Sequence, residues 1–97
     1  MKDCLDILVI DDDEVDRMNV QILLDKEGVN ALVHEACDYS SGVEKIKSNQ
    51  FDCVLIDYKL PDATGVEVVE NLRQVDQFNA PFILLTGMGG ERFVSEV

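Results

Sequence analysis

The sequence has few of the residues that mark secreted, membrane-spanning or nucleic-acid-binding proteins. Its three cysteines are an odd number without CxxC spacing, which favours reduced, buried thiols in a cytoplasmic protein over a disulfide framework. No apolar run approaches the roughly 18 residues of a membrane span, and no signal peptide precedes the first apolar segment. Only 8 lysines and arginines accompany 20 aspartates and glutamates, a net charge of −12. That charge argues against direct contact with nucleic acid or an anionic membrane.

What the chain does have is enough apolar sequence for one folded domain, with strands and helices in alternation. It has 97 residues, 46% of them hydrophobic, which excludes a disordered chain. The pattern predicts strands over 5–10, 31–36, 51–56 and 81–85, with helices over about 14–27 and 64–75 and another beginning at 91. A further helix, capped by Asp38 or Ser40, is predicted from the apolar positions Tyr39, Val43 and Ile46. The residues that we expect on the buried face of the first helix are Val15, Met18, Val20, Ile22, Leu23 and Leu24.

This alternation predicts an α/β fold in which right-handed crossovers build an open parallel sheet with helices on both faces. Strand ends recur at intervals that place a fifth strand beyond Val97. We therefore expect residues 1–97 to form a single domain that is incomplete at its C-terminus. The fourth strand would then lie at an exposed edge of the sheet, and such an edge invites a homodimer through strand pairing.

Three of the predicted strands end at residues whose side chains can bind a ligand or take part in a reaction. The first runs into Asp11, Asp12 and Asp13, the third into Asp57, and the fourth into Thr86 and Gly87. The carboxyl ends of parallel strands share one edge of a sheet, and ligands bind there. Clustered carboxylates oppose one another's ionisation unless a cation lies among them. Oxygen ligands favour Mg²⁺ or Mn²⁺, so we predict a metal site at Asp11, Asp12 and Asp57.

An aspartate beside a bound metal ion is suited to attack phosphorus and form an aspartyl phosphate, a role that we assign to Asp57. The Thr86 hydroxyl and the backbone N–H of Gly87 are positioned to bind the phosphoryl group. Lys59 follows Asp57 by two residues, and we expect it to offer its backbone carbonyl while its ammonium group faces solvent. Asp13 is expected to interact with a helix dipole, and His34, the only histidine, to be structural.

The residues around these positions resemble the receiver domain of two-component response regulators. The resemblance rests on Leu8 to Asp13, on the stretch from Val54 through Asp57 and Pro61 to Gly65, and on Ile83 to Gly87. It implies a flavodoxin-like sheet of order 2-1-3-4-5, the last strand and helix lying outside this chain. It also implies that Asp57 accepts phosphate from a histidine kinase or phosphotransfer protein, with Mg²⁺ held by Asp11, Asp12, Asp57 and the Lys59 carbonyl.

The same resemblance makes Thr86 a switch hydroxyl and implies an output domain in the parent protein. It describes a phosphoacceptor signalling domain, with self-catalysed phosphoryl transfer and dephosphorylation only, and not an enzyme. The family's lysine after the fifth strand has no counterpart before Val97. We therefore expect phosphoryl transfer to this chain to be impaired.

Two other functions fit parts of the pattern. A haloacid dehalogenase-like phosphatase would use Asp11 as nucleophile, with Asp13 completing a D-x-D pair and Thr86 following a later strand. That interpretation leaves Asp57 and Pro61 unexplained. A receiver-like interaction domain that is never phosphorylated is the second alternative. An EF-hand starting at Asp11 is excluded, because its sixth position is Asp16 instead of glycine and its twelfth is Ile22 instead of glutamate.

Overall fold

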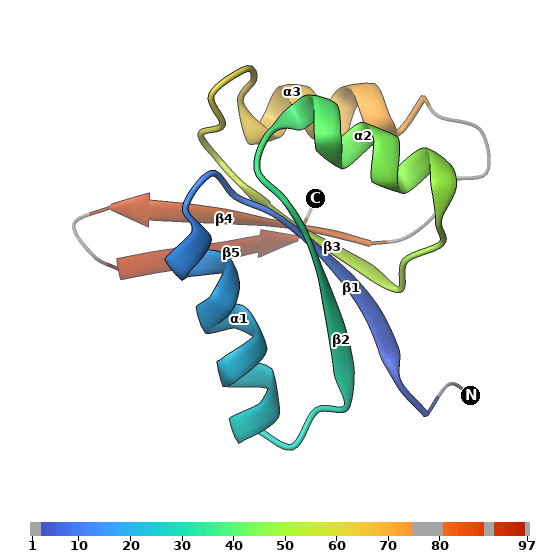
Figure 1. The fold of residues 1–97 in the computed structure, drawn as a ribbon. Coiled ribbons are helices and arrows are strands. Elements are labelled where there is room, and N and C mark those ends of the chain that lie inside the picture. Colours follow the sequence, from blue (N-terminus) through green and yellow to red (C-terminus); the bar gives the residue numbers. More distant parts are fainter. Residues whose placement is uncertain (1–2, 75–80, 89–90, 97) are drawn as a thin grey trace.

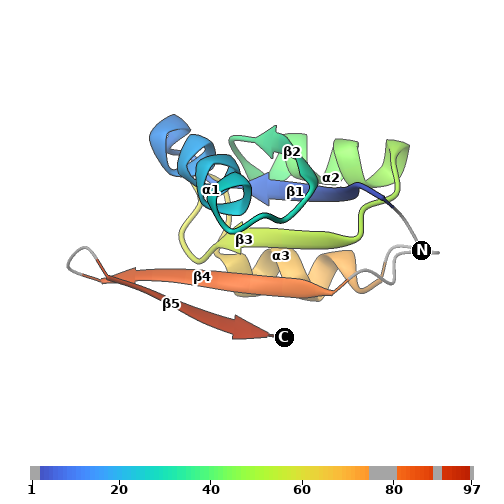
Figure 2. The same ribbon diagram turned by 90° about the horizontal axis from the view of Figure 1, so that it is seen from below.

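The computed structural model describes residues 3–74, 81–88 and 91–96. Five strands form one sheet in the order β2-β1-β3-β4-β5, with β1 to β4 parallel and β5 antiparallel to β4. Figure 1 shows α2 and α3 together on one side of the sheet and α1 on the other, and Figure 2 shows β5 beyond β4 at the end farthest from β2. In chain order the elements are β1 (Leu5–Ile10), α1 (Glu14–Lys26), β2 (Ala31–Ala36), α2 (Tyr39–Ser48), β3 (Cys53–Asp57), α3 (Gly65–Leu72), β4 (Phe82–Met88) and β5 (Glu91–Glu96).

The helices begin and end where short-range sequence signals place them. The Asp13 side chain accepts a hydrogen bond from the Val15 N–H at 2.8 Å and caps α1. After α1 the chain turns at Gly28, whose φ of 75° is a left-handed conformation that glycine adopts readily. α3 begins with a capping box, in which Thr64 Oγ1 accepts from the Glu67 N–H at 3.2 Å and Glu67 Oε1 accepts from the Thr64 N–H at 3.4 Å.

The sheet separates two apolar clusters of unequal size. Side chains alternate along β1, so Leu8 and Ile10 face α2 and α3 whereas Ile7 and Val9 face α1. Fully buried residues on the side of α2 and α3 include Val54, Ile56 and Val68. The buried residues of the larger cluster are Leu8, Ile10, Ala36, Ile46, Phe51, Val54, Ile56, Leu60 and Val68, and those of the smaller are Ile7, Val9 and Ala31.

The predicted buried face of α1 is wrong for most of its residues. Val20 and Leu24 pack against the smaller cluster as expected. The exposed members of the predicted stripe are Val15, Met18, Ile22 and Leu23, with 52 to 57% of their surface accessible. α1 contacts β1 and β2, so one narrow stripe of the helix suffices to cover that part of the sheet.

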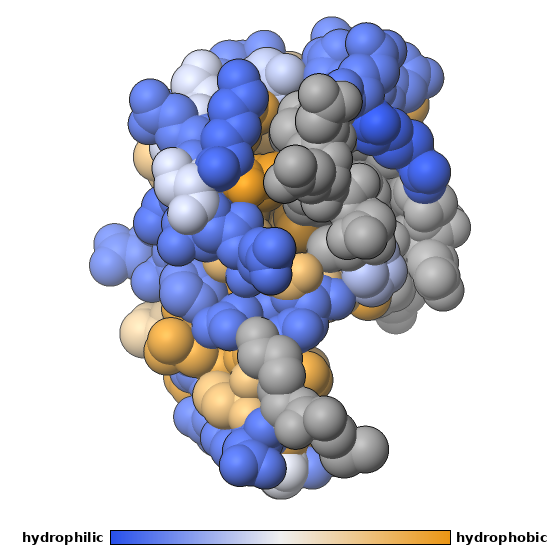
Figure 3. Space-filling view, turned by 90° about the vertical axis from the view of Figure 1, so that its right-hand side faces the viewer, coloured by the Kyte–Doolittle hydropathy of each residue, from blue (hydrophilic) through white to orange (hydrophobic). Residues whose placement is uncertain are grey.

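Exposed apolar residues also lie at the start of β1 and on β2, at Leu5 and Leu32. Figure 3 shows a face on which apolar surface gathers in the lower part of the molecule, where β1 and β2 begin in Figure 1. The upper part of the same face is mostly hydrophilic among the residues that are coloured.

The C-terminal segment differs from the prediction. Residues 91–96 form β5 and not a helix, and β4 continues through Thr86 to Met88 instead of stopping at Leu85. β5 pairs with β4 from Ile83↔Glu96 to Met88↔Glu91, so β4 is not the exposed edge and a dimer through that edge is not supported. Phe93 is aromatic and Val94 is β-branched, and both residue types favour strand. Pairing with β4 satisfies backbone groups that an open edge would leave bare.

Within the described part of the chain, every helix is too short or too polar to cross a membrane.

Candidate functional site

Two adjacent aspartates after β1, Asp11 and Asp12, meet Asp57 at the carboxyl end of the parallel strands. β1 and β3 are neighbours with Ile10 beside Ile56, so Asp11, which follows β1, and Asp57, which ends β3, lie at the same level of the sheet. Asp11, Asp12 and Asp57 each contribute one carboxylate oxygen to a group whose members lie within 4.8 Å of one another. Asp11 is buried with 1% of its surface accessible, whereas Asp12 is exposed and Asp57 is half-buried.

Asp11 is held in place from several directions. Its N–H donates to the carbonyl of Ala36 at 3.0 Å, and its Oδ1 accepts from the Asp13 N–H at 2.9 Å. Arg17 Nη1 donates to the Asp11 carbonyl at 2.5 Å, and Arg17 Nε is 3.1 Å from Glu35 Oε1. These contacts fix the buried carboxylate before any ligand arrives.

The sequence analysis did not identify Arg17 or Glu35. Arg17 lies in the first turns of α1, where its N–H donates to the Asp13 carbonyl at 3.1 Å. A single cation one helical turn after three aspartates was a signal that could have indicated a contact with the acidic segment. Glu35 gave no such signal, because its pairing with Arg17 depends on how α1 lies over β2.

The loop after Asp57 forms a short hairpin. Lys59 and Thr64 face each other in an antiparallel bridge, and the Leu60 N–H donates to the Ala63 carbonyl at 2.9 Å. Leu60 is buried in the larger apolar cluster, and Lys59 is exposed, as expected for an ammonium group in solvent. Asp62, at the tip of this hairpin, accepts hydrogen bonds from the start of α2, a contact that sequence reasoning missed.

Thr86 and Gly87 lie on the strand next to the acidic group. β3 and β4 are parallel with Asp57 beside Leu85, so Thr86 is one residue further toward the carboxyl end of the sheet. Within the β4–β5 pair, Thr86 lies opposite Phe93 and Gly87 opposite Arg92. The backbone thus brings Thr86 to the edge that carries Asp57, and the roles of its hydroxyl and of the Gly87 N–H stay predictions.

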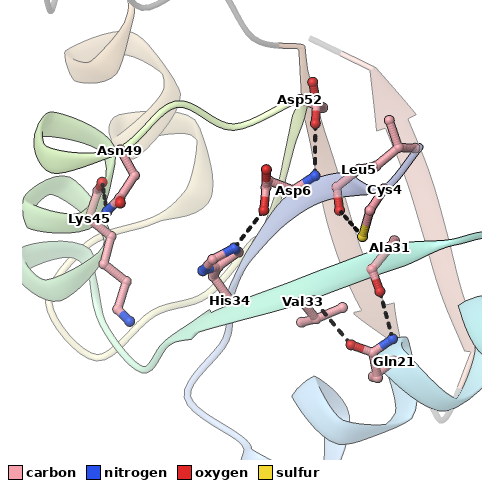
Figure 4. Close-up of polar contacts among 10 residues, drawn as sticks. All are labelled: Cys4, Leu5, Asp6, Gln21, Ala31, Val33, His34, Lys45, Asn49 and Asp52. Carbon is pink, nitrogen blue, oxygen red and sulfur yellow. Dashed lines mark hydrogen bonds and ion pairs between the residues drawn. The ribbon is translucent and has the colours of Figure 1, made fainter. Parts of the chain in front are cut away.

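His34 lies in the middle of β2, beside Leu8 of β1, and its side chain contacts residues near the amino ends of β1 and β3 (Figure 4). Its Nε2 is 3.0 Å from Asp6 Oδ1, and its ring meets Phe51 edge to face with centroids 5.2 Å apart. The Asp6 N–H in turn donates to Asp52 Oδ2 at 2.7 Å. These contacts confirm the structural role predicted for His34.

The cysteine prediction is confirmed in part. Cys4, Cys37 and Cys53 are all free thiols, as expected. The expectation that they are buried is wrong for Cys4 and Cys37, which are exposed, while Cys53 is half-buried beside the smaller apolar cluster. Cys4 precedes β1 and Cys37 follows β2, so both lie in connecting segments that the sheet does not cover.

Comparison with known proteins agrees with this arrangement. Residues 7–97 match the family model described as "Response regulator receiver domain". The chain is 34% identical over 86 residues to the autoinducer 1 sensor kinase/phosphatase LuxN of Vibrio campbellii. That alignment covers 89% of this chain and 10% of LuxN. It is 33% identical over 86 residues to the transcriptional regulatory protein SrrA of Staphylococcus aureus, with 89% of this chain and 34% of SrrA covered.

Among solved structures, the response regulator TrrA of Thermotoga maritima, in complex with Mg²⁺ and BeF, superposes with a TM-score of 0.76 at 29% identity. That superposition covers 88% of this chain and 71% of the TrrA chain. The phosphatase and binding-only alternatives are not favoured by these similarities. The fold, the converging aspartates and the match over residues 7–97 lead to one conclusion: the chain belongs to the response regulator receiver domain family.

Proposed function

We propose that Asp57 accepts a phosphoryl group and that Asp11, Asp12 and Asp57 hold a Mg²⁺ or Mn²⁺ ion, with the backbone carbonyl of Lys59 as a further ligand. The observation that carries the proposal is the approach of three carboxylate oxygens to within 4.8 Å of one another, from two strands, at the carboxyl end of the sheet. Receiver domains of this family are signalling modules, so the proposed reaction serves a switch in this protein and not metabolic turnover.

The donor set fits a hard divalent cation. All three side chains offer carboxylate oxygens, which Mg²⁺ and Mn²⁺ prefer. Mg²⁺ usually keeps several waters, and the exposure of Asp12 leaves the group open to them on one side. When bound, the ion would neutralise charge on the oxygens of the transferred phosphoryl group.

The chain's own residues supply the nucleophile and its position. An Asp57 carboxylate oxygen forms a bond to phosphorus while the bond from phosphorus to the donor breaks, and the departing donor atom keeps the electron pair. Asp57 follows four residues of β3, which pairs with β1 on one side and with β4 on the other. This central place in the sheet holds the carboxylate at the carboxyl edge. In this proposal the Thr86 hydroxyl and the Gly87 N–H donate to phosphoryl oxygens, and movement of Thr86 toward them begins the switch.

The phosphodonor that we propose is a histidine kinase or phosphotransfer protein. Val15, Met18 and Ile22 form an exposed apolar stripe on α1, and Val15 is three residues from Asp12. A donor that reaches Asp57 must cover surface around the acidic group, and exposed apolar surface beside it favours such contact. Replacing Met18 with Glu should slow labelling by a protein donor and leave labelling by a small acyl phosphate unchanged.

Further parts of the proposal concern the parent protein. We propose that residues 1–97 form one receiver domain, that the parent carries an output domain, and that it acts in the cytoplasm, where the three free thiols would stay reduced. We expect no direct contact with nucleic acid or membrane, given the net charge of −12.

Incubation with a small acyl phosphate and Mg²⁺, followed by peptide mapping of the labelled residue, tests the proposed function. The label should appear on Asp57, should require the divalent ion, and should be lost in Asp57→Asn. A label on Asp11 would favour the phosphatase chemistry instead. If neither this chain nor a longer form that includes the family's last strand is labelled under these conditions, the phosphoacceptor assignment is wrong.

A further inference from the structure

Two aspartates cap the first turn of α2, and only one of them directly precedes the helix in sequence. Asp38 is the N-cap and accepts from the Ser41 N–H at 2.8 Å. Asp62 comes from the loop after β3, more than 20 residues away in sequence. Its Oδ1 accepts from the Tyr39 N–H at 2.8 Å, and its Oδ2 accepts from the Ser40 N–H at 3.2 Å and from Ser40 Oγ at 3.3 Å.

Asp62 lies at the tip of the hairpin that begins two residues after Asp57. The bridge between Lys59 and Thr64 and the bond from the Leu60 N–H to Ala63 make this hairpin one unit. A carboxylate fixed at the tip therefore restrains the backbone of Lys59, whose carbonyl is the fourth protein ligand in the proposed site. α2 has no acidic residue within its first turn, so Asp62 adds a second negative charge, beside the N-cap Asp38, at the positive end of the helix dipole.

The same helix start is tied to the other side of the acidic group. The Asp11 N–H donates to the carbonyl of Ala36, which ends β2 three residues before Tyr39. The contacts of Asp62 thus close a ring that runs from Asp11 through the end of β2 and the start of α2 to the loop of Asp57. The other described contacts of that loop are its internal hairpin bonds, the packing of Leu60 and Ala63 against the larger apolar cluster, and the capping of α3 by Thr64. Of the described contacts, those of Asp62 join the loop to α2 by hydrogen bonds.

We propose that Asp62 is a positioning residue of the phosphoacceptor site, which fixes the loop carrying Lys59 to the N-terminus of α2. This inference rests on the proposed function of Asp57 and its metal ligands. Hydrogen bonding to the Tyr39 N–H, and then to Ser40, lowers the pKa of Asp62 below its ordinary range, in keeping with an ionised side chain that accepts from several donors.

Asp38 offers a matched control, because it caps the same helix and does not belong to the loop. Four proteins would be compared: the unmodified chain, Asp62→Ala, Asp38→Ala and Asp57→Asn. Mg²⁺ or Mn²⁺ affinity would be measured with each variant shown to be folded by circular dichroism. Both cap variants should lower the thermal midpoint. Only Asp62→Ala should also weaken metal binding, by roughly three- to tenfold, below the 10–100-fold typical of groups that contact a ligand directly.

Asp62→Asn keeps an acceptor oxygen and should give an intermediate affinity, which also covers the case in which Asp62→Ala does not fold. Equal metal affinity in Asp62→Ala and Asp38→Ala would overturn the inference while leaving the proposed function intact. Absence of metal binding in the unmodified chain, or no change in Asp57→Asn, would instead count against the proposed function.

Amide hydrogen exchange at Leu60 provides a readout that needs no metal. Exchange of the Leu60 N–H should be faster in Asp62→Ala than in the unmodified chain, and unchanged in Asp38→Ala. Equal exchange rates at Leu60 in both cap variants would show that Asp62 caps α2 without holding the loop, and would overturn the inference whatever the metal result.

Discussion

The two ends of β1 and β3 both carry aspartates, but their surroundings differ. At the amino end, Asp6 pairs with His34, and Asp52 accepts a backbone N–H. At the carboxyl end, Asp11, Asp12 and Asp57 approach one another. Asp6 and Asp52 at the first end each have a protein partner nearby. Asp11 at the second end also accepts from the Asp13 N–H, but there three carboxylates gather in one place, and such like charge is unfavourable in the absence of a cation. The difference teaches that acidic content alone does not mark a site, and that convergence of carboxylates does.

The largest expected difference between the two ends concerns metal binding. Asp11→Asn should weaken Mg²⁺ or Mn²⁺ binding by about tenfold or more, since attraction between unit charges about 4 Å apart is about 1 to 4 kcal/mol near a protein surface. Asn keeps the oxygen that accepts from the Asp13 N–H, so the loop should persist. Asp52→Asn at the amino end is the control, and calorimetric titration should give it unchanged affinity. An equal loss of metal affinity in Asp11→Asn and Asp52→Asn would show that the two ends of the strands do not differ as metal sites.

A second prediction concerns stability in the absence of metal. Asp12 is exposed and close to two other carboxylates. Its replacement by Asn should raise the free energy of unfolding by about 0.5 kcal/mol in a chelating buffer, because one like-charge contact of the kind found between surface charges is removed. Urea unfolding measures the change.

Adding Mg²⁺ should reverse the order of the two proteins, since ligand binding stabilises the form that binds more tightly. An Asp12→Asn protein that is less stable than the unmodified chain without metal would show that the carboxylates do not repel one another.

At the amino end, the expected effect is small and purely structural. His34→Gln should destabilise the protein by at most about 1 kcal/mol, the usual range for a partly exposed ion pair, together with a small loss from the ring contact to Phe51. Metal affinity should not change. Thermal unfolding and the metal titration used for Asp11→Asn together check this. A several-fold loss of metal affinity would mean that the two ends are coupled.

Asp62 lies near the carboxyl end of the sheet, but like Asp6 and Asp52 at the amino end its carboxylate has protein partners. Bonds from the Tyr39 N–H and then from Ser40 hold its pKa below the ordinary value of 3.8. A carboxylate with a lowered folded pKa stabilises the fold above the unfolded pKa, and this contribution is lost as the pH falls through the folded value. The thermal midpoints of the unmodified chain and Asp62→Asn should therefore converge as the pH drops below about 4. A constant gap down to pH 2 would contradict the assignment.

The acidic group could be predicted from sequence, because its position depends only on where two strands end and on how parallel strands are arranged in a sheet. Asp11, Asp12 and Asp57 each follow an apolar strand, and parallel strands end at a common edge. Helix starts were equally local, since capping pairs such as Thr64 and Glu67 lie within one turn.

Features set by tertiary contacts could not be predicted in the same way. The spacing of Val15, Met18 and Ile22 indicates a helix, but these residues are exposed. Val20 and Leu24 are the residues that pack against the sheet, and this depends on how α1 is oriented over β1 and β2. β5 depends on the free edge of β4, which no local signal encodes. The bonds of Arg17 to Asp11 and of Asp62 to Tyr39 join separate elements, so their side chains gave little or no sign of a role.

Paramagnetic broadening of amide signals by Mn²⁺ tests the central distinction most directly. At low Mn²⁺ concentration, signals of residues adjoining Asp11, Asp12 and Asp57 should broaden first, and added Mg²⁺ should restore them by competition. Signals around Asp6, His34 and Asp52 should stay sharp. Broadening centred on the amino end, or spread evenly over the acidic surface, would contradict the account.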